Sequence, residues 1–145
     1  MFLGTYLVSV TSGKRTAIPS LFREKLGNSL IIARWYEECL VLISKSSLDA
    51  LLTRVTGEGN LIINPIRQTE HFILASAFEV EADSQGRIVI PDRLFDYAKL
   101  GDQVYFLGLK DRVEIWNKEI WDEKEKIIEK GAPEYIEELS KRNGQ

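Results

Sequence analysis

The feature that most constrains this chain is an internal repeat with a spacing of 72 residues. Residues 8–19 read VSVTSGKRTAIP, and residues 80–91 read VEADSQGRIVIP. Arg15 aligns with Arg87 in this comparison, and both segments end in proline. A repeat of this kind indicates one supersecondary unit that occurs twice and buries its apolar face against its copy.

The similarity continues beyond each proline. A short helical stretch follows, at residues 20–26 and 92–100, and each ends before a glycine, Gly27 or Gly101, as is typical of helix C-termini. Two apolar, strand-like runs separated by a polar turn come next in both copies. The expected strands are residues 30–33 and 40–43 in the first copy, and residues 104–107 and 113–116 in the second.

Each copy therefore reads strand, turn, strand, short helix, strand, turn, strand. A unit of about 40 residues rarely buries enough apolar surface to be stable alone. Two such units packed together would share one core and cover each other's sheet edges. The sequence predicts one pseudo-symmetric domain of the α+β class, mainly β with short helices.

The connector and the tail are predicted to be helical. A turn signal at residues 57–60 precedes Pro65, where a helix can begin because proline suits the first helical positions. After Lys118, apolar residues recur at spacings of three and four, and Gly131-Ala132-Pro133 is expected to break that helix. The expected segments are a first repeat at 5–47, a helical connector at 48–75, a second repeat at 76–119 and an acidic helical tail at 120–145.

Net charge argues against a nucleic-acid partner, but its distribution does not. The chain carries a net charge of −3, and affinity for a duplex comes mostly from neutralising phosphates. Residues 1–75 hold eight Lys and Arg against six Asp and Glu, whereas residues 76–145 hold eleven against sixteen. Much of the acid follows Lys118, so a basic surface elsewhere remains compatible with DNA binding.

The repeated loop is the candidate for that surface. Asp83 is suited to capping the turn through backbone N–H groups, and Gly86 allows a positive φ. Alternation along the next strand puts Arg87 and Val89 on the face opposite to Ile88. A guanidinium at this junction is available to a phosphate or a guanine edge.

These motifs resemble the MraZ family of the SpoVT/AbrB superfamily. Residues 78–121 are similar to the second family repeat, and the likeness extends over about the first 125 residues. The residues that carry it are DSQGRIVIP at 83–91 and EIW at 114–116, together with FLG at 2–4, RTAIP at 15–19, FR at 22–23 and CLVL at 39–42.

The resemblance implies a fold and a function. The fold is a pseudo-dimeric, swapped-hairpin β-barrel made of two AbrB-like repeats, with a C-terminal helical tail. The function is sequence-specific, DNA-binding transcriptional regulation in the bacterial cytoplasm, associated with the nucleoid. Such proteins act at the promoter of the division and cell-wall gene cluster, and their chains form ring-shaped homo-oligomers on repeats in double-stranded DNA.

DNA contact is carried by the resemblance onto Arg15 and Arg87, and onto Arg23 of the first short helix, whose counterpart in the second copy is Phe95. Lys14 adds a charge where the second copy has Gly86. The first loop departs from the pattern because Thr11 stands where Asp is expected, yet its charge predicts the stronger phosphate binder. The DNA-binding candidates are Lys14, Arg15, Arg23, Arg87 and Arg93, with Asp83 and Gly86 shaping the second loop.

One alternative is an antitoxin-like AbrB module that grips a partner protein through residues 118–145. An enzyme is not expected, because the chain has no Ser/His/Asp set and no Gly-rich phosphate loop of the required spacing. His71 and Cys39 are single residues of their type, so no metal, cofactor or small-molecule substrate is predicted. No apolar run has the ~20 residues of a membrane helix, and no signal peptide is expected.

Overall fold

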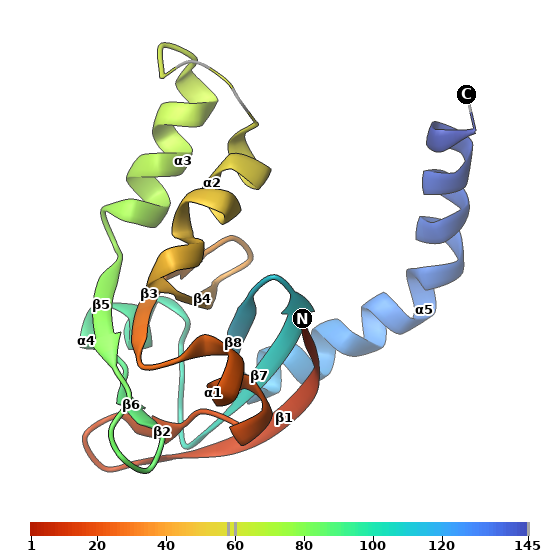
Figure 1. The fold of residues 1–145 in the computed structure, drawn as a ribbon. Helices are drawn as coiled ribbons and strands as arrows, with labels where there is room; N and C mark the ends of the chain where they lie inside the picture. The colour runs from red at the N-terminus through yellow and green to blue at the C-terminus, as the bar shows by residue number, and fades with distance from the viewer. Residues whose placement is uncertain (58, 60, 145) are drawn as a thin grey trace.

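The computed structural model describes residues 1–57, 59 and 61–144. The described chain forms a barrel of antiparallel strands together with several helices (Figure 1). The first half contains β1 (Phe2–Thr11), β2 (Arg15–Ala17), α1 (Ser20–Leu26), β3 (Ser29–Trp35), β4 (Cys39–Ser44), the 3₁₀ turn η1 (Lys45–Ser47), α2 (Leu48–Thr56) and α3 (Asn64–Leu74). The second half contains β5 (Phe78–Glu81), β6 (Arg87–Val89), α4 (Asp92–Tyr97), β7 (Gln103–Lys110), β8 (Val113–Asn117) and α5 (Lys118–Asn143).

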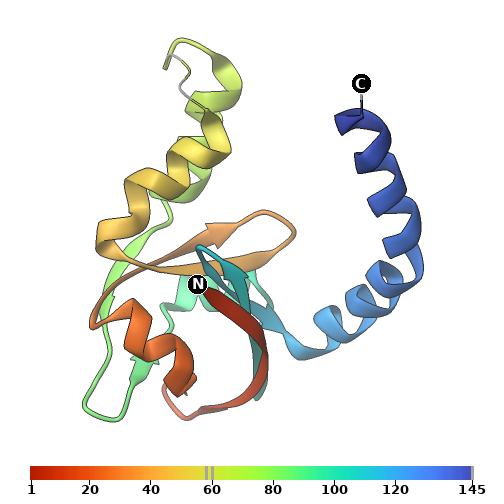
Figure 2. The same ribbon diagram turned by 45° about the vertical axis from the view of Figure 1, so that its right-hand side comes forward.

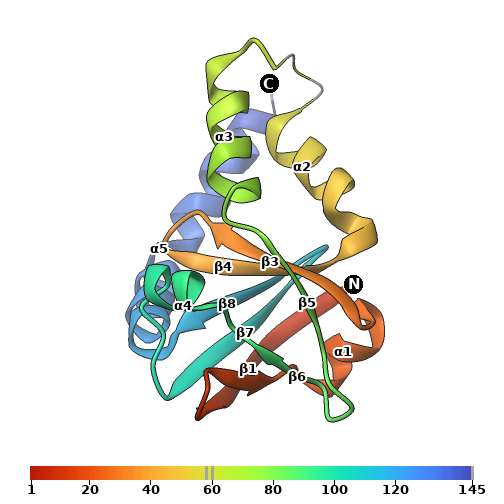
Figure 3. The same ribbon diagram turned by 90° about the vertical axis from the view of Figure 1, so that its left-hand side faces the viewer.

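The strands form one sheet that curls into a nearly closed barrel. Their order is β5-β3-β4-β8-β7-β1-β2-β6. The two outer strands of this order, β5 and β6, follow each other in the chain and are joined by a hairpin turn (Figure 3). The α+β class predicted from the sequence is confirmed.

The two copies exchange their N-terminal hairpins. Strand β1 of the first copy pairs with β7 of the second, where Val8 lies opposite Val104. Strand β5 of the second copy pairs in turn with β3 of the first, where Val80 lies opposite Leu30. Each hairpin therefore covers a sheet edge that belongs to the other copy, which confirms the swapped-hairpin barrel.

Strands β2 and β6 complete the exchange by pairing with each other. Arg15 lies opposite Val89, and Ala17 lies opposite Arg87. The backbone N–H of Ile18 donates to the Gly86 carbonyl at 2.9 Å, and that of Ile90 donates to the Lys14 carbonyl at the same distance. These contacts are equivalent under the 72-residue repeat, so the pairing has a pseudo-twofold axis at its centre.

Both faces of the central strands are buried. Inside the barrel, the core combines apolar residues of the two copies, among them Ile18, Phe22, Leu30, Leu42, Ile88, Ile90, Leu94, Phe106 and Ile115. A second cluster on the outer face of β3 and β4 includes Trp35, Val41, Ile43, Leu51, Ile73 and Trp116. Burial on two faces explains why β3 and β4 read as continuous apolar runs.

The two short helices end differently. Helix α1 ends before Gly27, which has a φ of +74°, as expected. Helix α4 ends at Tyr97, and the left-handed position after it is occupied by Lys99 with a φ of +55°, so the prediction for Gly101 is wrong. The N–H groups of Lys99 and Leu100 donate to the carbonyls of Asp96 and Phe95, and these two bonds stabilise the earlier stop.

The tail is one helix, so the predicted break at residues 131–133 is wrong. Helix α5 runs from Lys118 to Asn143 with Pro133 inside it. Proline removes one backbone donor and bends a helix without necessarily ending it. The first part of α5 packs on the barrel, where the Tyr105 hydroxyl donates to Asp122 at 2.7 Å. The second part turns and extends away from the barrel (Figures 1 and 2).

The connector forms a helical arm. Helices α2 and α3 project from the outer face of β3 and β4 on the side opposite to the β2–β6 pairing (Figure 3). Helix α3 starts at Asn64-Pro65, close to the expected start at Pro65. Two residues of the predicted turn, Glu58 and Asn60, lie outside the described residues. None of the helices described is long and apolar enough to cross a membrane.

Candidate nucleic-acid interface

The paired strands β2 and β6, called the ribbon below, have one face in the barrel and one face outside. Thr16 and Ile88 point inward and are buried. The outward face carries Arg15 and Arg87, one from each copy. In the antiparallel register, each arginine lies beside a small or apolar residue of the other strand, so the two guanidinium groups sit diagonally across the ribbon.

The second loop is held by Asp83. One carboxylate oxygen, Oδ1, accepts the backbone N–H groups of Gln85 and Arg87 at 2.9 Å, and Oδ2 accepts Nε of Arg87 at 2.9 Å. The Gly86 N–H donates to the Asp83 carbonyl at 2.9 Å, and Gly86 has a φ of +76°. This is a three-residue hairpin loop with a left-handed last residue. The hydrogen bonds, chiefly that from the Arg87 N–H, hold the pKa of the Asp83 carboxyl below its ordinary value.

The first loop reaches a related shape with different residues. Thr11 donates its hydroxyl to the Arg15 carbonyl at 3.2 Å. Gly13 and Lys14 both have a left-handed backbone, with φ values of +81° and +58°. Lys14 thus takes the same left-handed region as its aligned partner Gly86, although it carries a side chain.

The Lys14 side chain contacts helix α4 of the other copy. Its ammonium lies 2.5 Å from Oδ1 of Asp92 and 5.2 Å from the centroid of the Phe95 ring. The hydrogen bond to Asp92 raises the pKa of Lys14 above its ordinary value. Lys14 remains half-buried, so its charge is partly accessible at the surface.

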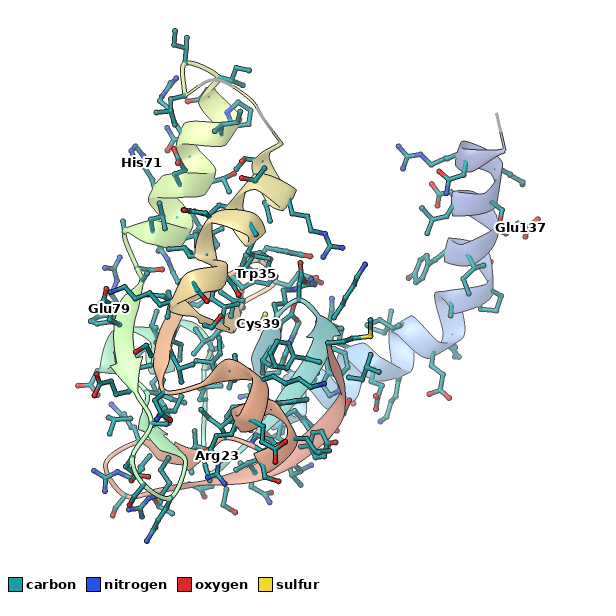
Figure 4. All side chains as sticks on the ribbon, in the orientation of Figure 1. Arg23, Trp35, Cys39, His71, Glu79 and Glu137 are labelled. Atoms are coloured by element: carbon teal, nitrogen blue, oxygen red, sulfur yellow. The ribbon has the colours of Figure 1, made fainter. Side chains whose placement is uncertain are left out.

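Arg23 contacts the loop of the second copy. Its Nη1 donates to the Gln85 carbonyl at 2.7 Å, although the two residues are 62 positions apart. A side chain at Gly86 would overlap the Arg23 guanidinium, because an added Cβ would lie 1.7 Å from Nη1. Figure 4 shows Arg23 at the barrel end opposite to the helical arm that carries His71.

The remaining two cations differ in their surroundings. Within the described part of the chain, the Arg15 guanidinium makes no hydrogen bond or ion pair, and the residue is exposed. Arg93 lies on α4, and its Nη1 is 3.5 Å from the Ala75 carbonyl at the end of the connector. The structure therefore brings Lys14, Arg15, Arg23 and Arg87 to the ribbon and its two loops, while Arg93 points toward the connector.

Sequence reasoning missed the residues that hold these cations. Asp92 and Phe95 contact Lys14, and the Gln85 carbonyl contacts Arg23, in each case across the two copies. A signal was present in the repeat alignment, because residue types differ at two aligned pairs, Lys14 with Gly86 and Arg23 with Phe95. Only the fold places Lys14 beside Phe95 and Arg23 beside Gly86.

The other chemically notable residues lie elsewhere. His71 is exposed, with Nδ1 3.2 Å from the Gln68 side-chain oxygen. Cys39 is buried, and burial raises the pKa of its thiol. Trp116 is buried and packs against Trp121 with ring centroids 5.1 Å apart. Among the residues described, no three His, Cys, Asp or Glu side chains are grouped so that they could hold a metal ion.

Two copies of one unit exchange hairpins to form a single barrel, and the barrel presents an arginine-bearing ribbon to solvent. The fold and this surface define a class of two-repeat, swapped-hairpin barrels. Comparison with known proteins identifies the family. Residues 73–142 match the family model described as "MraZ protein, putative antitoxin-like".

Full-length similarity points to the same family. The chain is 35% identical over 143 residues to "Transcriptional regulator MraZ" of Caldanaerobacter subterraneus subsp. tengcongensis, covering 99% of both chains. It is 40% identical over 125 residues to the protein of the same name from Acetivibrio thermocellus, covering 84% of this chain and 85% of that one. The chain belongs to the MraZ family, which confirms the resemblance seen in the sequence.

The family is one of transcriptional regulators and not of enzymes, in agreement with the sequence prediction. Among solved structures, the chain is similar to the solution structure of PHS018 from Pyrococcus horikoshii with a TM-score of 0.33 and 13% identity, covering 79% of this chain and 88% of that one.

Proposed function

We propose that this protein is a sequence-specific DNA-binding regulator that contacts duplex DNA through the outward face of the β2–β6 ribbon. The observation that carries the proposal is the placement of Arg15 and Arg87 on that one face, related by the pseudo-twofold axis. The target, as the family resemblance implies, is the promoter of the division and cell-wall gene cluster. The setting is the cytoplasm, in association with the nucleoid.

The shape of the ribbon suits this role. The major groove of B-DNA admits a two-stranded β-ribbon, and arginine can donate two hydrogen bonds to a guanine edge. The small neighbours of the two arginines, Ala17 and Val89, leave the guanidinium groups room to reach a base or a phosphate. Lys14 and Arg23 add positive charge at the two loops that flank the ribbon.

An acidic chain can still bind DNA if several ribbons act together. We infer a ring-shaped homo-oligomer whose ribbons engage repeats in the promoter, since linking weak sites raises overall affinity by about 10²–10⁴. Exposed apolar side chains provide contact surface for neighbouring copies, including Leu3 and Leu7 on β1 and Ile127, Ile136 and Leu139 on α5. Analytical ultracentrifugation tests the ring, and a sedimentation profile of a monomer at micromolar concentration would contradict it.

The test of DNA binding is a fluorescence-anisotropy titration at two salt concentrations. The labelled duplex carries the sequence upstream of the protein's own gene, and a scrambled duplex is the comparison. We expect preferential binding that weakens steeply with salt, and a loss of at least tenfold in affinity for Arg15→Ala and for Arg87→Ala. Arg142→Ala, an exposed substitution near the end of α5, is the matched control and should bind as the wild type does.

DNA affinity that is unchanged by both arginine substitutions, or that is equal for the two duplexes, would refute the proposal.

A second candidate function has support from the tail. Helix α5 exposes the apolar side chains of Tyr135, Ile136 and Leu139 on a part of the molecule that extends from the barrel. An antitoxin-like module would use this stripe to bind a partner protein, and Ile136→Ser with Leu139→Ser would abolish stoichiometric co-purification of that partner.

A further inference from the structure

Residue types differ between the two copies at two aligned positions of the repeat. Lys14 in the first loop aligns with Gly86 in the second, and Arg23 on α1 aligns with Phe95 on α4. The first copy thus carries a cation at both positions, and the second copy carries none. At these two positions, the first copy therefore has two more positive charges than the second.

The fold redistributes these charges. Each loop contacts the short helix of the other copy, so Lys14 meets Phe95, and Gly86 meets Arg23. At the first loop the cation is on the loop and the helix supplies an aromatic ring, with Nζ 5.2 Å from its centroid. At the second loop the cation is on the helix, and the loop has a glycine that leaves space for it.

Both contacts are fixed by a further hydrogen bond. The Lys14 ammonium is paired with Asp92 in the first turn of α4, and the Arg23 guanidinium donates to the Gln85 carbonyl. Both loops also have a left-handed residue at the aligned position, Lys14 or Gly86, so their backbones turn in the same sense there. A left-handed backbone costs little for glycine and more for lysine, which agrees with the extra contacts made by Lys14.

We propose that each loop presents one cation at an equivalent place at its end of the ribbon, supplied by Lys14 in one case and by Arg23 in the other. Arg23 is then the cation of the second loop and acts together with Arg87, not with its sequence neighbour Arg15. Phe95 and Asp92 are the positioning residues of Lys14. The part of this inference that concerns DNA binding rests on the proposed function. The part that concerns the contacts between each loop and the opposite helix does not.

The first test needs no DNA. In Arg23→Ala, the backbone amides of residues 85–87 should exchange with deuterium at least ~5-fold faster, because the Gln85 carbonyl loses its anchor. The amides of residues 13 and 14 should be unchanged. Lys25→Ala is the matched control, since Lys25 lies on the same helix but donates to the Met1 carbonyl. Unchanged exchange at residues 85–87 would overturn the assignment of Arg23.

The second test is a pair of double-mutant cycles in DNA affinity. The losses from Arg23→Ala and Arg87→Ala should depart from multiplicativity by about 3-fold or more, as is usual for groups that share one loop. The losses from Arg23→Ala and Arg15→Ala should multiply. The reverse pattern would overturn the proposal. If the wild type shows no salt-dependent DNA binding, the proposed function is refuted, and the deuterium-exchange test then decides whether the contacts between loop and helix hold.

The third test moves the cation. The slope of log affinity against log salt concentration is negative, and Lys14→Gly should reduce its magnitude by about 0.9, the value for one lost phosphate contact. The double substitution Lys14→Gly with Phe95→Arg moves the cation from the loop to the helix, as at the second loop, and should restore the slope. The reverse exchange, Arg23→Phe with Gly86→Lys, should preserve it. Circular dichroism checks that each exchange variant is folded. If neither folded variant keeps the slope, the two arrangements are not equivalent and the proposal is wrong.

Discussion

Thr16 and Ile88 lie directly opposite each other at the centre of the ribbon, and they are the same position in the two copies. Both side chains point into the barrel and are 1% exposed. The pseudo-twofold axis passes between them, so residues on the outer face of the ribbon occur in pairs. The shared face of Arg15 and Arg87 is a direct consequence of this register.

The charge on Asp83 should make the stability of the second loop depend on pH. The carboxylate accepts hydrogen bonds from Gln85 and Arg87, and its pKa is lowered in the folded protein. Its stabilising effect is therefore complete above the unfolded pKa of about 3.9 and is lost as the pH falls through the lower folded pKa. Thermal melts of the wild type and Asp83→Asn should differ by a constant amount above about pH 5.

Below about pH 4, the difference between these two proteins should shrink, because the wild-type carboxyl then gains a proton. Asp102→Asn, an exposed substitution before β7, is the control and should melt as the wild type does from pH 7 to pH 3. A difference between wild type and Asp83→Asn that stays constant down to pH 3 would mean that the carboxylate charge does not hold the loop.

Gly86→Ala should destabilise the fold by about 1–2 kcal/mol. Gly86 has a φ of +76°, a region that costs an L-residue about that much, and the added methyl group would also displace the Arg23 guanidinium. Gly101→Ala is the matched control, because an added Cβ there meets no atom within 4 Å and its φ is not left-handed. Urea denaturation at fixed protein concentration should separate the two variants, and equal stabilities would contradict the prediction.

Arg112→Ala should cost about 3 kcal/mol. Glu114 is buried on β8, and it accepts Nε of Arg112 and Nε1 of Trp116, both at 2.9 Å. Removing Arg112 leaves a buried carboxylate without its counter-charge, which typically costs 3–5 kcal/mol. The partial exposure of Arg112 places this site at the lower end of the range.

The double substitution Arg112→Leu with Glu114→Leu is the informative comparison. It removes both charges. Val41, which is paired with Glu114 across β4 and β8, already provides an apolar neighbour at this site. We expect the double variant to be more stable than Arg112→Ala by about 1 kcal/mol or more in urea denaturation. A double variant less stable than the single one would show that the hydrogen bond to Trp116 matters more than the buried charge.

Cys39 should be unreactive in the folded protein. The residue is buried, and burial raises the pKa of its thiol, so little thiolate is present at neutral pH. An aromatic disulfide reagent should label it only as the barrel opens, at a rate that increases with urea concentration. Stoichiometric labelling of the native protein within minutes would contradict this prediction, and the urea-unfolded chain gives the full labelling value.

Local features of the chain were predictable from the sequence. The bounds of α1 follow from Pro19, the apolar spacing and Gly27, all of which act within one helical turn of the residues they affect. Gly131-Ala132-Pro133 predicts a helix end, but helix α5 continues through Pro133, because one proline does not reveal whether the helix continues beyond it. The stop of α4 at Tyr97 was missed for a related reason, since Lys99 adopts a conformation usually left to glycine.

The repeat, the α+β class, the alternation of Arg87 with Ile88 and the family were determined by the sequence alone, because periodicity and motif spacing are properties of the chain itself. Tertiary structure alone decided which partners meet: β1 with β7, β5 with β3, Lys14 with Phe95, and Arg23 with the loop of Gly86. Hairpin exchange brings together residues more than 60 positions apart, and such contacts depend on shared burial in one core, which no local pattern encodes.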